Sequence, residues 1–179
     1  KILMAKFLEM FGDPATNPKG WEVRRLGDAV EIIMGQSPPS SSYNVEGRGI
    51  PFLQGKAEFG DYYPNPIKWC DSPLKKAISG DILISVRAPV GDVNICPFDI
   101  CIGRGLAALR PKDGVSNTWF LFFLLKKLKS EIESLSGGST FKAITKSNIE
   151  NIQIPLPPIE LQKQFAQIVE EFEKKREEM

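Results

Sequence analysis

The stretch Gly80-Asp81-Ile82-Leu83-Ile84-Ser85-Val86-Arg87-Ala88-Pro89-Val90-Gly91 is the most informative part of the sequence for the fold. Its apolar run predicts a strand from Asp81 to Val86, because a short apolar run bounded by turn residues is typical of a buried strand. The Pro and Gly that follow predict a turn. The same alternation of short apolar runs with turn residues continues on both sides of this stretch.

Five further strands are expected from this pattern. Together with the first, they are Glu22 to Leu26, Val30 to Met34, Ile50 to Leu53, Asp81 to Val86, Val93 to Ile95 and Leu106 to Arg110. Helical spacing of apolar residues predicts one helix from Asn117 to about Leu135, with Asn117 or Ser116 as its N-terminal cap. A short helix should follow Thr145, with Ile149 and Ile152 facing inward. Helices and strands do not alternate regularly, so we expect an α+β fold, an irregular globule with a mixed or antiparallel sheet.

Amphipathic helical segments flank this globule. Residues 1–11 carry apolar side chains at coiled-coil spacing and end at Gly12-Asp13-Pro14. After the stiff segment Pro155 to Pro158, a long helix of coiled-coil type is expected from near Glu160 to Met179. The sequence therefore predicts three parts: the end of a preceding helix (1–11), the globule (12–157) and the start of a C-terminal helix (158–179). Because the chain opens at Lys1 within a helical pattern, we expect it to be part of a longer protein.

The composition excludes several kinds of site. The 179 residues include 23 basic and 22 acidic ones, for a net charge of +1, so any affinity for nucleic acid must come from a local basic surface. There is no histidine, which excludes Ser-His-Asp and Cys-His catalysis and histidine-ligated metals within this sequence. Its three cysteines, Cys70, Cys96 and Cys101, form no metal-binding pair, and we expect buried free thiols in a reducing compartment. No apolar run approaches the ~20 residues that cross a bilayer, and no signal peptide opens the sequence. We therefore predict a cytoplasmic protein with no cofactor, no metal and no membrane contact.

Four polar or glycine-rich loops are candidates for contacting DNA. Residues Gly35 to Tyr43 offer hydroxyls and an amide, Arg87 stands at a strand end, Gly103-Arg104-Gly105 precedes a strand, and Gly137 to Lys142 combines glycines, hydroxyls and a lysine. Each loop alone also fits an ordinary surface loop, a salt bridge or a helix-capping linker. None of them matches a P-loop or a dinucleotide-binding fingerprint.

Two sets of site residues follow from these patterns. The expected DNA-facing surface, built from loops at strand and helix ends, consists of Gln36, Ser37, Ser41, Tyr43, Gln54, Lys56, Arg87, Arg104, Gly138, Ser139, Thr140, Lys142 and Lys146. The expected subunit interface, formed by the apolar stripes of the terminal helices, consists of Leu3, Phe7, Met10, Leu161, Phe165, Ile168 and Phe172. The alternative for these stripes is that they pack on the core of the chain itself.

The succession of motifs resembles the target-recognition domain of the specificity subunits of type I restriction–modification systems. The motifs that carry the resemblance are Trp21 to Asp28, Gly35 to Pro38, Ile50 to Leu53, Gly80 to Gly91, Gly138 to Lys142 and Ile154 to Gln162. Phe7 to Pro14 resembles the helical spacer that precedes the second recognition domain of that family. Two departures stand out: family members usually have two recognition domains and two spacer helices, and they often place Asn-Gln where this sequence has Gly103-Arg104.

The resemblance implies a reader of DNA and not an enzyme. In such systems one globule recognises half of a bipartite site in double-stranded DNA, and the spacer helices set the distance to the other half. The helices also dock the modification (methyltransferase) subunit, which binds S-adenosylmethionine and methylates adenine, while a restriction subunit cleaves DNA with ATP-driven translocation. For an isolated module, a homodimer through the terminal helices is a further expected partner.

Three alternatives remain at the level of sequence. The globule could be the recognition domain of a single-chain restriction–methylation enzyme, or the chain could be a helical scaffold without DNA binding. A nuclease is disfavoured, because Glu22, Asp61 and Asp81 belong to no acid–acid–lysine cluster of the required spacing.

Overall fold

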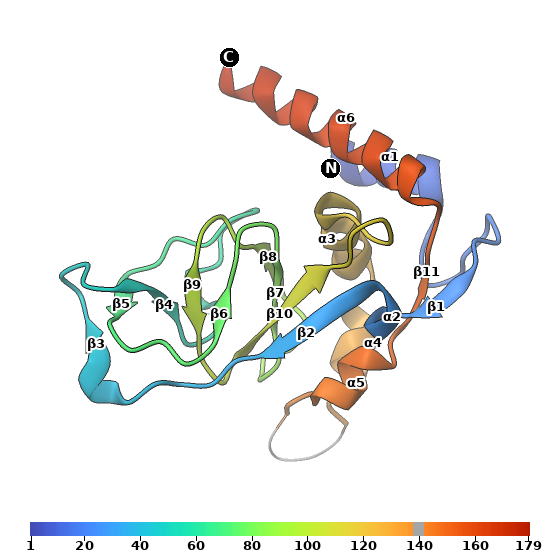
Figure 1. The fold of residues 1–179 in the computed structure, drawn as a ribbon. Coiled ribbons are helices and arrows are strands. Elements are labelled where there is room, and N and C mark those ends of the chain that lie inside the picture. Colours follow the sequence, from blue (N-terminus) through green and yellow to red (C-terminus); the bar gives the residue numbers. More distant parts are fainter. Residues whose placement is uncertain (138–141) are drawn as a thin grey trace.

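A computed structural model describes residues 1–137 and 142–179 of the chain (Figure 1). The helices are α1 (Ile2–Phe11), α2 (Leu26–Ala29), α3 (Thr118–Lys127), α4 (Lys129–Ser134), α5 (Lys146–Glu150) and α6 (Ile159–Glu177), with 3₁₀ turns η1 (Ser40–Ser42) and η2 (Lys56–Glu58). The strands are β1 (Val23–Arg25), β2 (Val30–Met34), β3 (Tyr43–Asn44), β4 (Ile50–Leu53), β5 (Lys68–Cys70), β6 (Lys76–Ala77), β7 (Ile82–Ser85), β8 (Val93–Ile95), β9 (Ile100–Ile102), β10 (Leu106–Pro111) and β11 (Gln153–Pro155).

The strands of the described residues form two main sheets and one small pair. The four-stranded sheet has the order β2-β10-β7-β8 and is antiparallel throughout. The five-stranded sheet has the order β3-β5-β4-β9-β6, in which only β4 and β9 run parallel. Strands β1 and β11 pair separately. The prediction of an α+β fold with mixed or antiparallel sheets is thus confirmed.

The predicted elements agree with the structure where the apolar pattern is strong. Strands β2, β4 and β8 have the expected bounds. Strands β1 and β7 are one residue shorter than predicted at each end, and β10 is one residue longer at its C-terminal end. Strands β3, β5, β6, β9 and β11 were not predicted. Strand β11 ends at Pro155, in the segment that the sequence predicts to be stiff and without regular structure. Pro155 is opposite Val23 at the end of the β1–β11 pair, where a residue without an N–H group is tolerated.

The predicted helix from Asn117 to Leu135 was wrong in one respect, since it is two helices. Asn117 caps α3 as expected, its Oδ1 accepting from the backbone nitrogens of Trp119 and Phe120 at 3.0 and 3.3 Å. The backbone leaves helical geometry at Leu128 (φ −94°, ψ 11°), and α4 then begins. This bend leaves both Leu128 and Ile132 buried. The short helix α5 follows Thr145 as predicted, with Ile149 buried and Ile152 half-buried.

Helix α3 lies between the four-stranded sheet and the two terminal helices (Figure 1). Its residues from Phe120 to Leu125 are all buried, because one face packs on β7 and β8 and the other on α1 and α6. The rings of Phe7 and Phe165 lie 5.5 Å apart, and the rings of Phe120 and Phe123 also adjoin Phe7. The terminal helices therefore belong to the main core of the globule.

This packing corrects part of the predicted subunit interface. Leu3, Phe7 and Phe165 are only 4%, 1% and 0% exposed, so burial in the chain's own core removes them from its surface. The other four residues of that set are half-buried against the same core: Met10, Leu161, Ile168 and Phe172.

Two polar contacts fix α6 to the globule. The fully buried amide of Gln162 donates to the carbonyls of Val115 and Pro157 and accepts from the backbone nitrogen of Asn117. Farther along the helix, the hydroxyl of Tyr62 donates to Glu173 Oε1 at 2.8 Å. The first half of α6 is thus hydrogen-bonded to the segment after β10, and the second half to the segment between β4 and β5.

The cysteines are buried free thiols, as predicted. Burial raises the pKa of Cys96 to about 12 and that of Cys101 to about 11, so both are protonated near neutral pH. Among the described residues, no helix combines the length and the apolar character needed to cross a membrane.

Candidate nucleic-acid interface

Four strands end at one common edge of the globule. The antiparallel registers Met34↔Ala107 and Ser85↔Leu106 place the ends of β2 and β7 beside the start of β10. Strand β9 ends just before β10 begins, and the parallel register Leu53↔Ile102 places the end of β4 beside the end of β9. The loops that follow all four strands therefore emerge together, although the strands belong to two different sheets.

Hydrogen bonds join three of these loops. Ser37 Oγ lies 3.0 Å from Oε1 and 2.9 Å from Nε2 of Gln54, and it accepts from the backbone nitrogen of Arg104 at 3.2 Å. The loops approach so closely that only glycine fits at Gly35, where a Cβ atom would overlap the carbonyl oxygen of Gly103. The sequence thus places small residues where the two sheets meet and polar side chains directly beside them.

Arg87 and Lys142 extend this edge. The backbone nitrogen of Val86 donates to the carbonyl of Gly105 at 2.9 Å, which connects the loop after β7 to the loop after β9. Arg87 also forms an isolated antiparallel bridge with Ala143, and Ala88 donates to the carbonyl of Lys142 at 2.9 Å. We call Gln36, Ser37, Gln54, Arg87, Arg104 and Lys142 the strand-end edge.

The cations of the strand-end edge are available for a ligand. Arg87, Arg104 and Lys142 are exposed, and within residues 1–137 and 142–179 no carboxylate lies within ion-pair distance of any of them. The alternative of a surface salt bridge at Arg87 is therefore not seen in that part of the chain. Guanidinium groups and an amide side chain are the groups that recognise guanine and adenine edges, and lysine suits phosphates.

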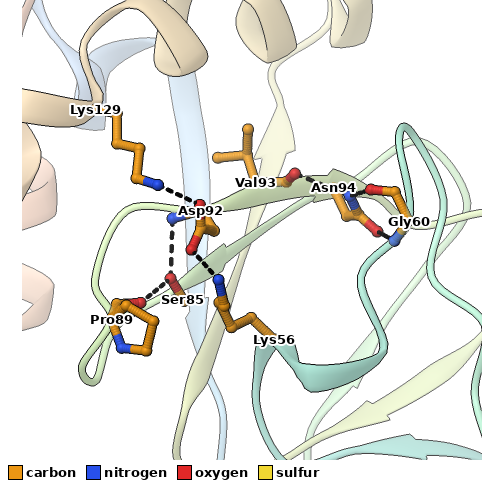
Figure 2. A network of polar contacts seen from close by, with 8 residues as sticks. All are labelled: Lys56, Gly60, Ser85, Pro89, Asp92, Val93, Asn94 and Lys129. Atoms are coloured by element: carbon orange, nitrogen blue, oxygen red, sulfur yellow. Dashed lines mark hydrogen bonds and ion pairs between the residues drawn. The ribbon is translucent and has the colours of Figure 1, made fainter.

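Lys56 is next to this edge but is already paired (Figure 2). Its Nζ lies 2.6 Å from Oδ2 of Asp92, and the Nζ of Lys129 lies 2.6 Å from Oδ1 of the same carboxylate. Burial alone would raise the pKa of the Asp92 carboxyl, but the hydrogen bonds and charges of Lys129 and Lys56 outweigh it and lower that pKa. Sequence reasoning missed Asp92 and Lys129, because no local pattern connects residues so far apart in the chain.

The other predicted contact residues are outside the set that forms the strand-end edge. Tyr43 is half-buried, stacks on Phe52 with ring centroids 4.6 Å apart and donates to the carbonyl of Pro38. Tyr43 is opposite Cys70, which also pairs with the first residue of β4, so the backbone of Tyr43 lies beside the start of that strand while its hydroxyl reaches Pro38, the residue after Ser37. Ser41, two residues before Tyr43, is exposed in η1. Lys146 lines a hollow with residues at the start of β2 and after the end of β10, again toward the far edge. Gly138, Ser139 and Thr140 lie outside the described residues.

The acidic side chains offer little for catalysis in the described residues. Asp81, which is 1% exposed, accepts two hydrogen bonds of 3.0 Å from Arg110 and so has a structural partner. No group of three or more cysteine, aspartate or glutamate side chains in that part of the chain is close enough to hold a metal ion.

Comparison with known sequences identifies the family of the chain. Residues 18–178 match the family model described as the type I restriction modification DNA specificity domain. Over 151 residues the chain is 59% identical to a Methanocaldococcus jannaschii protein whose provisional name is type I restriction enzyme MjaX specificity subunit, covering 83% of this chain and 36% of that protein. It is 29% identical over 168 residues to the type I restriction enzyme MjaIX specificity subunit of the same organism, covering 87% of this chain and 38% of the relative. These relatives are named specificity subunits, as the sequence predicts.

Solved structures give the same result. A structure described as the basis of complex assembly and conformational transition of the type I R-M system superimposes with a TM-score of 0.81 at 47% identity, over 97% of this chain and 44% of that one. The HsdS subunit from Thermoanaerobacter tengcongensis superimposes with a TM-score of 0.77 at 46% identity, over 97% of this chain and 43% of that one. The chain spans less than half the length of each of these relatives.

Proposed function

Since the chain belongs to the family of type I restriction–modification DNA specificity domains, we propose that its globule reads one half of a bipartite DNA sequence through the strand-end edge. The observation that supports this proposal is that four strand ends from two sheets lie together, which brings Gln54, Arg87 and Arg104 to one place. Side chains held on strand ends keep a fixed spacing, and a fixed spacing is what base-specific hydrogen bonding requires.

The charge distribution supports a local contact with DNA. The chain has a net charge of only +1, so it lacks a general attraction to nucleic acid. Arg87, Arg104 and Lys142 nevertheless place three exposed cations on one edge. Phosphate contacts from such residues supply salt-dependent affinity, while the arginines and Gln54 supply discrimination between bases.

The division of the chain follows from this function. We assign residues 12–157 to target recognition, residues 1–11 to the end of one spacer helix and residues 158–179 to the start of another of coiled-coil type. In the whole protein these helices set the distance to a second half-site and dock the modification subunit, which in turn brings in the restriction subunit. The proposed location is the cytoplasm, where such a complex meets DNA.

Catalysis is assigned to the partner subunits. Histidine-dependent chemistry is excluded because the sequence contains no histidine, and neither a P-loop nor a dinucleotide fingerprint is present in it. We therefore expect neither methyl transfer from S-adenosylmethionine nor DNA cleavage by the purified chain, and a radioactive methyl-transfer assay checks the first of these.

The terminal helices also offer a contact for a second copy. Met10, Leu161, Ile168 and Phe172 are half-buried, and Ile2 is 66% exposed, so apolar surface remains on the outer side of α1 and α6. Sedimentation of the wild type and of the variant Ile168→Glu, Phe172→Glu tests this homodimer. Monomers for both proteins at high micromolar concentration would reject it.

The DNA-reading role is tested by selection. The purified chain is incubated with a pool of random duplexes, and bound molecules are recovered and sequenced over several rounds. We expect enrichment of one short base pattern by the wild type and by Arg48→Ala, whose residue lies before the start of β4, away from the strand-end edge. Arg104→Ala should lose preference at one position of that pattern. Recovery of no common pattern by the wild type would contradict the proposed function.

A further inference from the structure

A single carboxylate, that of Asp92, bonds to two lysines beside the segments that carry the strand-end edge, as Figure 2 shows for Lys56 and Lys129. Asp92 stands just before β8, and its backbone is paired with the end of β7, because Ser85 N donates to Asp92 O at 2.9 Å. Asp92 N donates to Ser85 Oγ at 2.9 Å, and that hydroxyl donates to the carbonyl of Pro89 at 2.8 Å. These bonds shape the loop that carries Arg87.

The two oxygens of the carboxylate reach two other segments. Oδ2 accepts from Lys56 in η2, two residues after Gln54, and Oδ1 accepts from Lys129 at the start of α4, both at 2.6 Å. Asp92 therefore connects the start of α4 with the two parts of the chain that carry Gln54 and Arg87.

We propose that Asp92 is a positioning residue for sequence discrimination: it fixes these segments relative to one another and keeps two lysines from binding the phosphates of any DNA. This inference rests on the proposed function of the strand-end edge. It assigns Asp92 no contact with DNA, since its two oxygens are occupied by lysines of the same chain.

The charges of Asp92, Lys56 and Lys129 give the proposal a measurable consequence. The side chains of Asp92, Lys56 and Lys129 are 21%, 39% and 44% exposed, so both cations remain within reach of solvent and of a nearby ligand. Together the three groups carry a charge of +1, since two cations share one anion. Asp92→Asn raises this to +2 and removes the carboxylate that both lysines bind. Each would then take a DNA phosphate as its counterion, whatever the base sequence.

The expected effect therefore has two opposite parts. Asp92→Asn should strengthen binding to a duplex of random sequence and steepen its salt dependence. It should weaken the preference for the selected duplex over the random one, because the loops that carry Gln54 and Arg87 lose their common support. A residue needed only for folding would instead weaken binding to both duplexes alike.

A second variant separates charge from positioning. Asp92→Asn with Lys129→Gln returns the cluster to a charge of +1 but still lacks the carboxylate bridge. We expect it to restore random-duplex affinity and salt slope to wild-type values without restoring discrimination. Asp113→Asn is the matched control, because it makes the same change of charge at an exposed residue beyond the end of β10, at the far edge.

The measurement is the dissociation constant of each protein, at several salt concentrations, for a random duplex and for the duplex recovered by wild-type selection. Thermal unfolding confirms that each variant is folded. We expect the preference to fall about tenfold in both Asp92 variants, the order of one base contact, and to be unchanged in Asp113→Asn. An unchanged preference in folded Asp92→Asn, or equal weakening for both duplexes, would overturn the proposal. A wild type without any preference would instead reject the proposed function itself.

Discussion

The hydroxyl oxygen of Ser37 lies 3.0 Å from Oε1 and 2.9 Å from Nε2 of Gln54. Ser37 lies three residues after the end of β2 in the four-stranded sheet, and Gln54 directly follows β4 in the five-stranded sheet. The pair thus joins the two sheets at the edge where their strands end. The side chain of Gln54 is exposed there, and we propose that a base edge replaces Ser37 as its partner.

Gln54→Ala should reduce discrimination at one base position. A glutamine amide can pair with both hydrogen-bonding groups of adenine in the major groove, and such a contact contributes ~1–3 kcal/mol of discrimination. Competition between the selected duplex and duplexes altered at single positions measures this loss. Gln167→Ala, at an exposed position of α6, serves as the control and should behave as the wild type. Equal affinity losses at every position would contradict a base contact by Gln54.

Lys142→Ala should weaken binding to all duplexes alike. A lysine that contacts a phosphate contributes affinity without discrimination, and its loss lowers the slope of log K against log salt by about one. Titrations of the selected and random duplexes at several salt concentrations measure both quantities. Lys175→Ala, in the last turn of α6, is the control. If the slope stays the same in Lys142→Ala, this lysine is not a phosphate contact.

Gly35→Ala should damage the edge itself. Its new methyl group would overlap the carbonyl of Gly103, so the two sheets must move apart at the point where Ser37 and Gln54 meet. Overpacking of this kind costs roughly 1–3 kcal/mol, which chemical unfolding can measure. Gly55→Ala is the control, since no atom beyond its own residue and its two chain neighbours lies within 4 Å of the added carbon there. Similar stability of the two variants would show that the sheets are not so tightly joined.

Phe165→Ala should destabilise the chain strongly. This ring is 0% exposed and packs against Phe7, Phe11 and Phe123, and loss of a buried Phe costs ~3–5 kcal/mol. Phe172→Ala should cost clearly less, because that side chain is half-buried. Urea unfolding of both variants provides the comparison. Equal losses would mean that α6 packs on the core differently from the arrangement described.

Alkaline pH should release the contact between Tyr62 and Glu173. Burial and the hydrogen bond to Glu173 raise the pKa of the Tyr62 hydroxyl from its ordinary value of 10.0 to about 12. Because the folded state holds this proton more tightly, the stabilisation is complete below pH 10.0 and is lost as the pH rises toward about 12. Urea unfolding at pH 9 and pH 11 should therefore show a smaller loss of stability in Tyr62→Phe than in the wild type. The buried thiols also titrate in this range but are common to both proteins. An identical loss in the two proteins would contradict this role of Tyr62.

Strong local patterns were sufficient to predict every strand of the four-stranded sheet but only β4 of the five-stranded sheet. Val30–Met34, Ile50–Leu53 and Val93–Ile95 are apolar and bounded by turn residues, and each is a strand with the expected bounds. Strands such as β6, with only Lys76 and Ala77, are too short to carry a pattern and exist because β9 offers them a partner. The stripes on the terminal helices were recognised, but spacing alone could not show that Phe7 and Phe165 face one another within the same core.

The candidate site was predictable only in part, for a similar reason. Polar residues in loops beside strands are visible in the sequence: Gln54 and Arg87 follow predicted strands, and Arg104 precedes one. Which strand ends meet depends on the pairing of β4 with β9 and of β10 with β2 and β7, and no local pattern encodes that pairing. Lys56 was chosen on the same grounds, yet it pairs with Asp92, 36 positions away in the chain.

The central claim is that the strand-end edge faces DNA, and site-specific photocrosslinking tests it most directly. A photoreactive phenylalanine analogue replaces Gln36 in one variant and Arg48 in another, both exposed residues at opposite ends of the five-stranded sheet region. Each variant is irradiated with the radiolabelled duplex recovered by wild-type selection, and covalent protein–DNA products are separated on a denaturing gel. We predict a crosslink from position 36, suppressed by unlabelled selected duplex, and none from position 48. A crosslink from position 48 with none from position 36 would contradict the account.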